Sequence, residues 1–269
     1  MVYFPNAKIN LGLRILRKRP DGYHDLETCL VPVPWRDMLE MIASDTFSFQ
    51  SSGLPIPGNT GDNLCVRAYH LLRSDFELPP VQMHLHKIIP MGAGLGGGSA
   101  DAVAVLIGLN EQFGLTLDTA QLEGYAAQLG SDCPFFVQNR VRMAYETGTT
   151  LEDIDLDLSG YHLVLVYPNI AVSTAEAYAN VRPALPNTSL EETLESQPLA
   201  TWKDWVVNDF EASVFPQYPK LSDIKSALYQ AGAVYASMSG SGSALYGLFN
   251  EAVELPQSFD EYPVWQGAL

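Results

Sequence analysis

The residues from Pro90 to Ala102 have the composition of a phosphate-binding loop. They read Pro-Met-Gly-Ala-Gly-Leu-Gly-Gly-Gly-Ser-Ala-Asp-Ala and follow an apolar, strand-like run. Glycine adopts positive φ angles without steric cost, so successive backbone N–H groups can turn toward one anion. The start of the helix expected after the loop attracts the same anion. The pattern favours phosphate binding over a flexible linker, because linkers do not usually join a strand directly to an amphipathic helix.

Lys8 and Asn10 are two residues apart in an alternating segment, so they share one face of a strand. Such a pair points either into a cleft or into solvent, and the pattern alone favours solvent because most strand lysines lie at the surface. Asp132 stands at a break between two expected elements, where a carboxylate ordinarily caps a helix or a turn. Spacing alone therefore assigns catalysis to neither Lys8 nor Asp132.

Two short clusters carry aromatic or imidazole side chains. Tyr23 and His24 follow turn residues; the pair can stack on a planar ligand, although an isolated pair is more often a packed edge residue and a solvated imidazole. His84 and His86 share a strand face, and imidazoles at this spacing can bind a metal. No third ligand with suitable spacing is visible, which favours an exposed strand face.

Hydrophobic periodicity predicts the elements that position these residues in the first half of the chain. Turn chemistry at residues 20–22 joins the first two strands into a hairpin. Glycines end the second and third helices. The expected strands are 8–16, 23–33 and 81–89, and the expected helices are 62–74, with Asp62 as its cap, 99–113 and 119–129.

An acidic, turn-rich stretch at 146–160 predicts a junction between two domains, residues 1–157 and 158–269. The second half has the pattern of a compact α+β sandwich. The turn Ser239-Gly240-Ser241-Gly242 either approaches a phosphate or only joins a hairpin. The expected elements of this half are a strand at 161–167, a helix at 173–181 opened by a capping box, a polar surface connection at 183–200, a helix at 222–231, and strands at 234–238 and 244–249.

Composition excludes several classes of protein. With 15 basic and 31 acidic residues among 269, the net charge is −16, so the surface should repel nucleic acid and anionic membranes. The cysteines, Cys29, Cys65 and Cys133, have neither paired nor metal-binding spacing and suit a reducing cytoplasm. No apolar run approaches the ~20 residues of a membrane helix, and no targeting segment is visible. A cytoplasmic protein is expected.

Five segments occur in the order seen in the GHMP small-molecule kinases, and the chain resembles that superfamily over nearly its whole length. The glycine loop and the late Ser-Gly-Ser-Gly are shared across the superfamily. The segments around Lys8 and Tyr23-His24 are typical of its members that act on a cytidyl substrate, rather than on mevalonate, homoserine or galactose. The five segments are residues 5–11, 21–24, 90–102, 130–136 and 239–242.

The resemblance implies a fold and an activity. The fold is the two-domain α+β GHMP kinase architecture, with an N-terminal ribosomal-protein-S5-like α/β domain, a C-terminal ferredoxin-like α+β sandwich, and the substrates meeting between them. The activity is ATP-dependent phosphorylation of the 2-hydroxyl of 4-diphosphocytidyl-2-C-methyl-D-erythritol, a step of non-mevalonate isoprenoid synthesis. ATP, Mg²⁺ and this cytidine diphosphate-linked sugar alcohol are the implied ligands, and a monomer or weak homodimer is expected.

The same resemblance assigns roles to residues of this chain. Asp132 becomes the base for the acceptor hydroxyl, and Lys8 the cation that keeps it ionised and steadies the developing charge. The substrate's cytidine diphosphate end is assigned to Asn10, Tyr23, His24, Thr174 and Tyr178. The nucleotide is assigned to Asn63 on the adenine side and, in the loop, to Pro90, Gly92, Gly94, Leu95, Gly96, Gly97, Gly98, Ser99 and Ala100. No carboxylate is assigned to the metal.

The chain departs from its relatives at two places. The loop often ends Ser-Ser-Asn in relatives, whereas this chain has Ser99-Ala100-Asp101. One hydroxyl is lost and one carboxylate is gained, so the contribution of the side chains to phosphate binding stays open. Binding by the backbone N–H groups requires neither the hydroxyl nor the carboxylate. Tyr178 stands where a phenylalanine can occur, and tyrosine keeps the aromatic face for stacking.

The alternative functions are a GHMP kinase for another small alcohol, a nucleotide-binding regulatory module without catalysis, and a purely structural protein. Retention of Lys8 and Asp132 argues against the regulatory module, because a binder needs no base.

Overall fold

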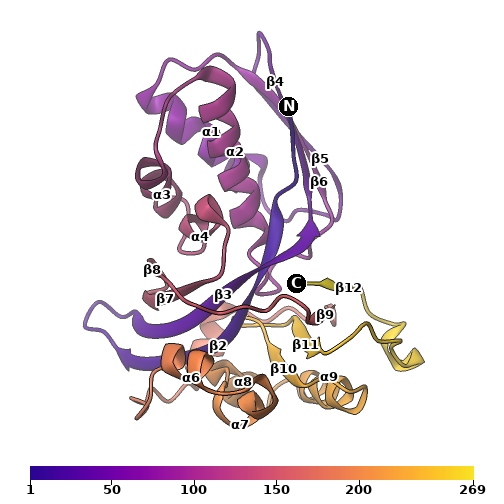
Figure 1. The fold of residues 1–269 in the computed structure, drawn as a ribbon. Helices are drawn as coiled ribbons and strands as arrows, with labels where there is room; N and C mark the ends of the chain where they lie inside the picture. The colour runs from indigo at the N-terminus through magenta and orange to yellow at the C-terminus, as the bar shows by residue number, and fades with distance from the viewer. The chain divides into compact units, whose positions relative to one another are not determined.

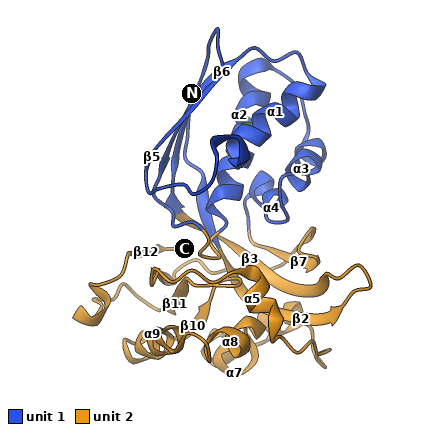
Figure 2. Cartoon of the chain, turned by 180° about the vertical axis from the view of Figure 1, so that it is seen from behind, with its two compact units in different colours: residues 1–8, 35–91, 96–140 blue, residues 9–34, 92–95, 141–269 orange.

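The computed structural model describes residues 1–269, and it mixes strands with helices throughout the chain (Figure 1). The chain divides into two compact units (Figure 2). Unit 1 comprises residues 1–8, 35–91 and 96–140, and unit 2 comprises residues 9–34, 92–95 and 141–269. Each compact unit is thus made of several segments of the chain, whereas the sequence analysis expected one junction between two continuous domains. The domain limits 1–157 and 158–269 stay a prediction.

Unit 1 is a four-stranded sheet with four α-helices, and all of these helices lie on one side of it in Figures 1 and 2. Its strand order is β1-β4-β6-β5, in which only the β5–β6 pair is parallel. The strands are β1 (Val2–Tyr3), β4 (Met38–Ala43), β5 (Ser48–Gly53) and β6 (Val81–Lys87). The helices are α1 (Leu64–Asp75), α2 (Gly97–Phe113), α3 (Thr119–Ala127) and α4 (Cys133–Gln138), preceded by the 3-10 turn η1 (Thr60–Asp62).

The alternation along the strands of unit 1 explains which face the helices cover. Leu39 and Met41 of β4 are fully buried, whereas Met38 before them and Ile42 after them are exposed. Apolar side chains at every second position must be removed from water, and the central helix α2 packs against α1 and α4 on that same side. The glycine loop connects the end of the strand β6 to the start of the helix α2.

Unit 2 contains two four-stranded sheets, ordered β2-β3-β7-β8 and β10-β11-β9-β12. Its core is a cluster of aliphatic and aromatic side chains contributed by both sheets and the helices. The strands are β2 (Asn6–Lys18) and β3 (His24–Arg36), whose ends extend into unit 1, with β7 (Arg142–Glu146), β8 (Thr150–Asp153), β9 (His162–Val166), β10 (Tyr235–Met238), β11 (Leu245–Phe249) and β12 (Val264–Ala268). The helices are α5 (Thr174–Ala179), α6 (Leu190–Ser196), α7 (Trp202–Trp205), α8 (Asp209–Val214) and α9 (Pro219–Gln230), with 3-10 turns at Leu199–Thr201 and Gln257–Phe259.

Most predicted elements are confirmed, and two details are wrong. The first predicted helix is capped by Asn63, whose side chain accepts from the Cys65 N–H, rather than by Asp62, which belongs to η1. The polar connection predicted at 183–200 contains α6, capped by Ser189. The predicted capping box of Ser173 and Glu176 is present at α5.

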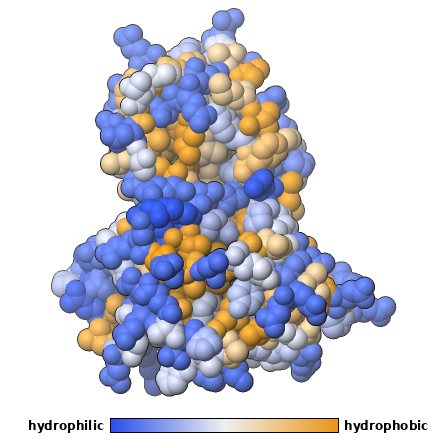
Figure 3. Space-filling model, in the orientation of Figure 1, coloured by the Kyte–Doolittle hydropathy of each residue, from blue (hydrophilic) through white to orange (hydrophobic).

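Hydrophilic residues cover most of the face drawn in Figure 3, with hydrophobic patches between them. None of the helices is both long and apolar enough to cross a membrane.

Candidate active site

The glycine loop has the backbone conformation that its composition predicts. Gly92, Gly94 and Gly96 have φ angles of 64°, 78° and 68°, in the left-handed region that other residues rarely adopt. The helix α2 begins directly afterwards, at Gly97, without a side-chain cap on its first N–H groups. Those groups are the unsatisfied donors of a helix N-terminus, so the loop presents backbone donors suited to an anion.

Lys8 and Asp132 form an ion pair, with Lys8 Nζ 3.4 Å from Asp132 Oδ2. The lysine side chain is only 3% exposed, whereas the aspartate side chain is 39% exposed. The expectation that Lys8 and Asn10 face solvent is therefore wrong: both are buried, because β2 is covered on both faces over much of its length. Asp132 precedes α4 but makes no side-chain cap. A carboxylate that caps nothing and meets a buried ammonium is available to accept a proton.

The glycine loop lies against the lysine of this pair. A Cβ built on Gly96 would come within 3.0 Å of Lys8 Cγ, so the loop passes over the stem of the side chain that ends at Asp132. Ser99, in the first turn of α2, hydrogen-bonds the buried Cys133 thiol next to Asp132; burial raises the pKa of that thiol to about 11, which this hydrogen bond opposes. The starts of α2 and α4 therefore bring the end of the glycine loop and the candidate base together within unit 1.

A hollow of ≈ 120 Å³ lies beside the loop in unit 1. Asn63 and Gly98 both line it, and so do the charged residues Asp62, Lys87 and Asp101. The aliphatic part of the lining suits a flat heterocycle, and the polar side chains suit its ring nitrogens and amino group. The full lining is Ile56, Pro57, Asp62, Asn63, Leu64, Leu85, Lys87, Met91, Gly98 and Asp101.

Asp37, Lys87 and Asp101 form a buried charge cluster that the sequence analysis missed. The Lys87 ammonium donates to Asp37 and, at 2.9 Å, to Asp101 Oδ2. Burial lowers the pKa of Lys87, but the two carboxylates outweigh this effect and leave it raised. A signal was present: Lys87 continues the buried series Val81, Met83 and Leu85 at every second residue of β6.

In unit 2, Asn10 is held by the turn of the β10–β11 hairpin. Its backbone N–H donates to Ser239 Oγ at 3.1 Å, and its side-chain amide donates to Thr28 at 3.1 Å. Ser239 Oγ in turn donates to the Gly94 carbonyl of the glycine loop at 2.8 Å. The Ser-Gly-Ser-Gly turn therefore joins a hairpin and also contacts the glycine loop, and its approach to a phosphate stays a prediction.

Tyr178 and His24 stack on each other in unit 2, with ring centroids 4.9 Å apart and an interplanar angle of 24°. Phe210 meets Tyr178 edge-on, which fixes the orientation of its ring. Thr174 starts the helix α5 that carries Tyr178 one turn later. Tyr23 is 67% exposed. The structure therefore brings His24 and Tyr178 together and leaves Tyr23 largely in solvent.

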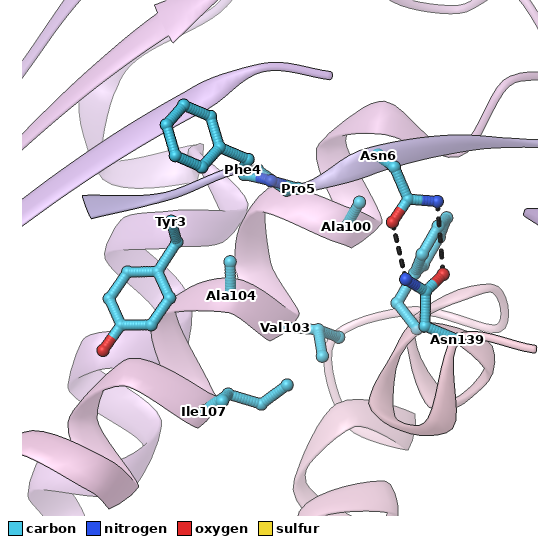
Figure 4. Close-up of a pocket in the computed structure, with 10 residues that line it drawn as sticks. Tyr3, Phe4, Pro5, Asn6, Ala100, Val103, Ala104, Ile107 and Asn139 are labelled. Atoms are coloured by element: carbon cyan, nitrogen blue, oxygen red, sulfur yellow. Dashed lines mark hydrogen bonds between the residues drawn. The ribbon is translucent and has the colours of Figure 1, made fainter. Parts of the chain in front are cut away.

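A second pocket, of ≈ 140 Å³, lies on the other side of α2 and is drawn in Figure 4. Ala100, Val103, Ala104 and Ile107 form one face of the helix there, and an amide pair between Asn6 and Asn139 crosses one end. Its lining carries no charged side chain, so it is unsuited to phosphate. The lining is completed by Tyr3, Phe4, Pro5 and Phe136.

No three His, Cys, Asp or Glu side chains lie close enough together to hold a metal ion. His84 and His86 instead both contact Ser52 Oγ, at 3.1 and 2.9 Å. Both histidines lie on one face of β6 and are half-buried rather than exposed.

Comparison with known proteins identifies the family. The family model "GHMP kinases N terminal domain" matches residues 63–140, and "GHMP kinases C terminal" matches residues 183–260. A protein of Parabacteroides distasonis named 4-diphosphocytidyl-2-C-methyl-D-erythritol kinase is 48% identical, over 100% of both chains. The chain belongs to this family of GHMP kinases.

Two further relatives agree with this membership. A protein of Bacteroides fragilis with the same name is 52% identical, over 93% of this chain and 92% of its own. A crystal structure of 4-(cytidine 5'-diphospho)-2C-methyl-D-erythritol kinase superposes with a TM-score of 0.80 at 31% identity, covering 99% of this chain and 98% of the other. Membership of a kinase family implies ATP as a substrate, and the predicted two-domain α+β kinase fold is confirmed.

Proposed function

We propose that this protein transfers the γ-phosphoryl group of ATP to the 2-hydroxyl of 4-diphosphocytidyl-2-C-methyl-D-erythritol. The observation that carries the reaction type is the Lys8–Asp132 pair beside the glycine loop. Support for the substrate comes from the relatives of that name at 48–52% identity over nearly the whole chain.

Asp132 is proposed as the base of the reaction. Its carboxylate is exposed enough for an alcohol to reach and to give it the hydroxyl proton, and the buried Lys8 ammonium lies beside it as a fixed counter-ion. As the hydroxyl oxygen attacks the phosphorus, the same ammonium opposes the negative charge that develops between them. In this proposal Lys8 holds the position of a positive charge beside the base and stabilises the transition state.

The nucleotide is proposed to bind along the glycine loop. The backbone N–H groups at the start of α2 hold the phosphates, as a helix N-terminus does for anions, and Ser99 adds a hydroxyl. The hollow lined by Asn63 and Gly98 holds the adenine. Magnesium enters with ATP as part of that substrate and neutralises phosphate charge. No protein ligand is assigned to it.

The cytidine end of the substrate is proposed to bind at His24 and Tyr178. Phe210 meets the Tyr178 ring edge-on and fixes its orientation, and His24 stacks on the same ring, so the two rings form an aromatic surface suited to stacking on a base. Asn10, Thr174 and the exposed Tyr23 complete the proposed set, and Tyr23 gains its partner only when the base is bound.

An assay of ADP release tests the proposal. The protein is given MgATP and, separately, the cytidyl-methylerythritol compound, mevalonate, homoserine or galactose. Release with the cytidyl compound alone is expected. Release with another alcohol instead would retain the kinase and discard the cytidine site. No release with any of the four, while MgATP still binds, would contradict catalysis itself.

A further inference from the structure

One ammonium and two carboxylates are buried together beside the glycine loop. Lys87 ends β6, Asp37 lies just before β4, and Asp101 lies in α2. Each residue is at most 2% exposed. Buried charges are stabilised only by close partners, so the balance of charge in such a cluster matters to whatever lies next to it.

The cluster joins the two ends of the loop. Asp37 Oδ1 accepts from the backbone N–H groups of Ile88 and, at 2.8 Å, Ile89, which follow β6 and enter the loop. Asp101 belongs to the helix that leaves the loop, and Lys87 bonds both carboxylates. A Cβ built on Gly97 would lie 2.9 Å from Lys87 Nζ, so the cluster touches the first turn of α2.

The charges of the cluster do not balance. With both carboxylates ionised, one ammonium faces two negative charges, and Asp101 Oδ1 is buried without a hydrogen-bond partner. The neighbouring elements do not correct this. Cys65 of α1 is kept neutral because burial raises its pKa well above the usual value, and Asp62, which lines the same hollow as Asp101, is acidic.

We propose that Asp101 tunes nucleotide affinity: its ionised carboxylate opposes the phosphates at the start of α2, and nucleotide binding is accompanied by its protonation. The proton comes from solvent and converts the carboxylate to a neutral carboxyl group; no bond of the nucleotide changes. This inference rests on the proposed function, because it takes the glycine loop to hold the phosphates of ATP.

The titration of Asp101 suits this role. Burial raises the pKa of Asp101 to about 7, with the Lys87 ammonium opposing the rise and the Asp37 carboxylate adding to it. Near neutral pH the group is therefore divided between its two forms. A polyanion bound nearby favours the protonated form, and by linkage protonation favours the bound polyanion.

Calorimetry of MgATP binding tests the inference. Binding is measured at pH 7 in two buffers of different ionisation enthalpy, which counts the protons taken up. The wild type is expected to take up about half a proton more than Asp101→Asn, since half the carboxyls are ionised at a pH equal to the pKa. At pH 8, Asp101→Asn should bind MgATP about three- to tenfold more tightly. The asparagine side chain retains an oxygen that can accept the hydrogen bond from Lys87. The exposed Asp45→Asn, an equal loss of charge, should match the wild type.

The outcomes separate the inference from the function beneath it. Equal proton uptake by the wild type and Asp101→Asn, or weaker binding by a folded Asp101→Asn, overturns the inference while MgATP binding stands. If Asp101→Asn does not fold, the wild type decides: uptake centred near pH 7 supports the inference, and no uptake between pH 6 and 9 overturns it. If MgATP binds to none of the proteins, the proposed function fails first, and the inference fails with it.

Discussion

The buried ammonium of Lys8 lies 3.4 Å from the half-open carboxylate of Asp132. The lysine comes from β2 near the start of the chain, and the aspartate precedes α4. This asymmetry of exposure suits a base with a fixed counter-ion. Only the carboxylate is accessible from solvent, while the stem of the lysine side chain lies between its strand and the glycine loop.

Asp132→Asn should abolish most turnover without abolishing binding. The amide keeps the shape of the side chain but cannot accept the hydroxyl proton, so kcat should fall by about 10²–10⁴. Steady-state kinetics and calorimetry of MgATP check the result. Near-normal kcat in a folded Asp132→Asn would remove Asp132 from the role of base.

Lys8→Met and Lys8→Arg together separate charge from shape. Met has a similar length and no charge, so kcat should fall about 10²-fold while the KM for ATP changes little. Arg retains the positive charge and should recover part of the activity. If the two variants lose activity equally, the positive charge is not what Lys8 supplies.

Gly97→Ala and Gly98→Ala form a matched pair within the first turn of α2. A Cβ at Gly97 would meet Lys87 Nζ at 2.9 Å and Ile89 Cγ2 at 3.0 Å, whereas one at Gly98 would meet only Leu64 Cδ1, at 3.9 Å. Gly97→Ala should lower the free energy of unfolding by about 1–3 kcal/mol. Gly98→Ala should leave it unchanged or raise it by up to about 1 kcal/mol, because alanine favours the helix. Urea denaturation of both variants gives the comparison, and equal losses would contradict the placement of Lys87.

Tyr178→Ala should weaken binding of the cytidyl substrate alone. Loss of an aromatic stacking face corresponds to about a three- to tenfold rise in the KM for that substrate, with the KM for ATP unchanged. Tyr178→Phe, which retains the face, serves as the control. An unchanged KM in Tyr178→Ala would argue that the base binds elsewhere.

The stability of the protein should depend on pH through Asp101. Its pKa is about 7 when folded, against an ordinary value near 4, so the folded state holds the extra proton between these two pH values. The stabilisation is complete below about pH 4 and is lost as the pH rises through 7. From pH 5 to 8 the wild type should therefore lose up to about 3 kcal/mol of unfolding free energy relative to Asp101→Asn, which does not titrate. Urea denaturation at four pH values measures the difference, and parallel curves would contradict it.

The glycine loop was predictable because its requirement is local. Positive φ angles at Gly92, Gly94 and Gly96 are a property of the residues themselves, and so are the helix that follows and its end at Gly114. The capping box at Ser173 and the strands β10 and β11 were found for the same reason. Each signal lies within a few residues of the structure that it specifies.

The burial of Lys8 was not predictable from alternation. A strand with polar residues on one face has the same sequence pattern whether that face meets water or protein, and here it meets protein. Only the resemblance to GHMP kinases suggested the pairing with Asp132. The Asp37–Lys87–Asp101 cluster was missed for a related reason, since its members come from three separate segments of the chain.

The contact between Gly94 and Ser239 restricts how this family can evolve. A Cβ on Gly94 would lie 2.0 Å from the Ser239 carbonyl oxygen, and the Ser239 hydroxyl bonds the Gly94 carbonyl across 145 residues of sequence. Any larger residue at position 94 would need the distant turn to withdraw, and a shifted turn would leave that carbonyl unbonded. In an alignment of relatives these two positions should be inherited as a pair, with changes at one accompanied by changes at the other.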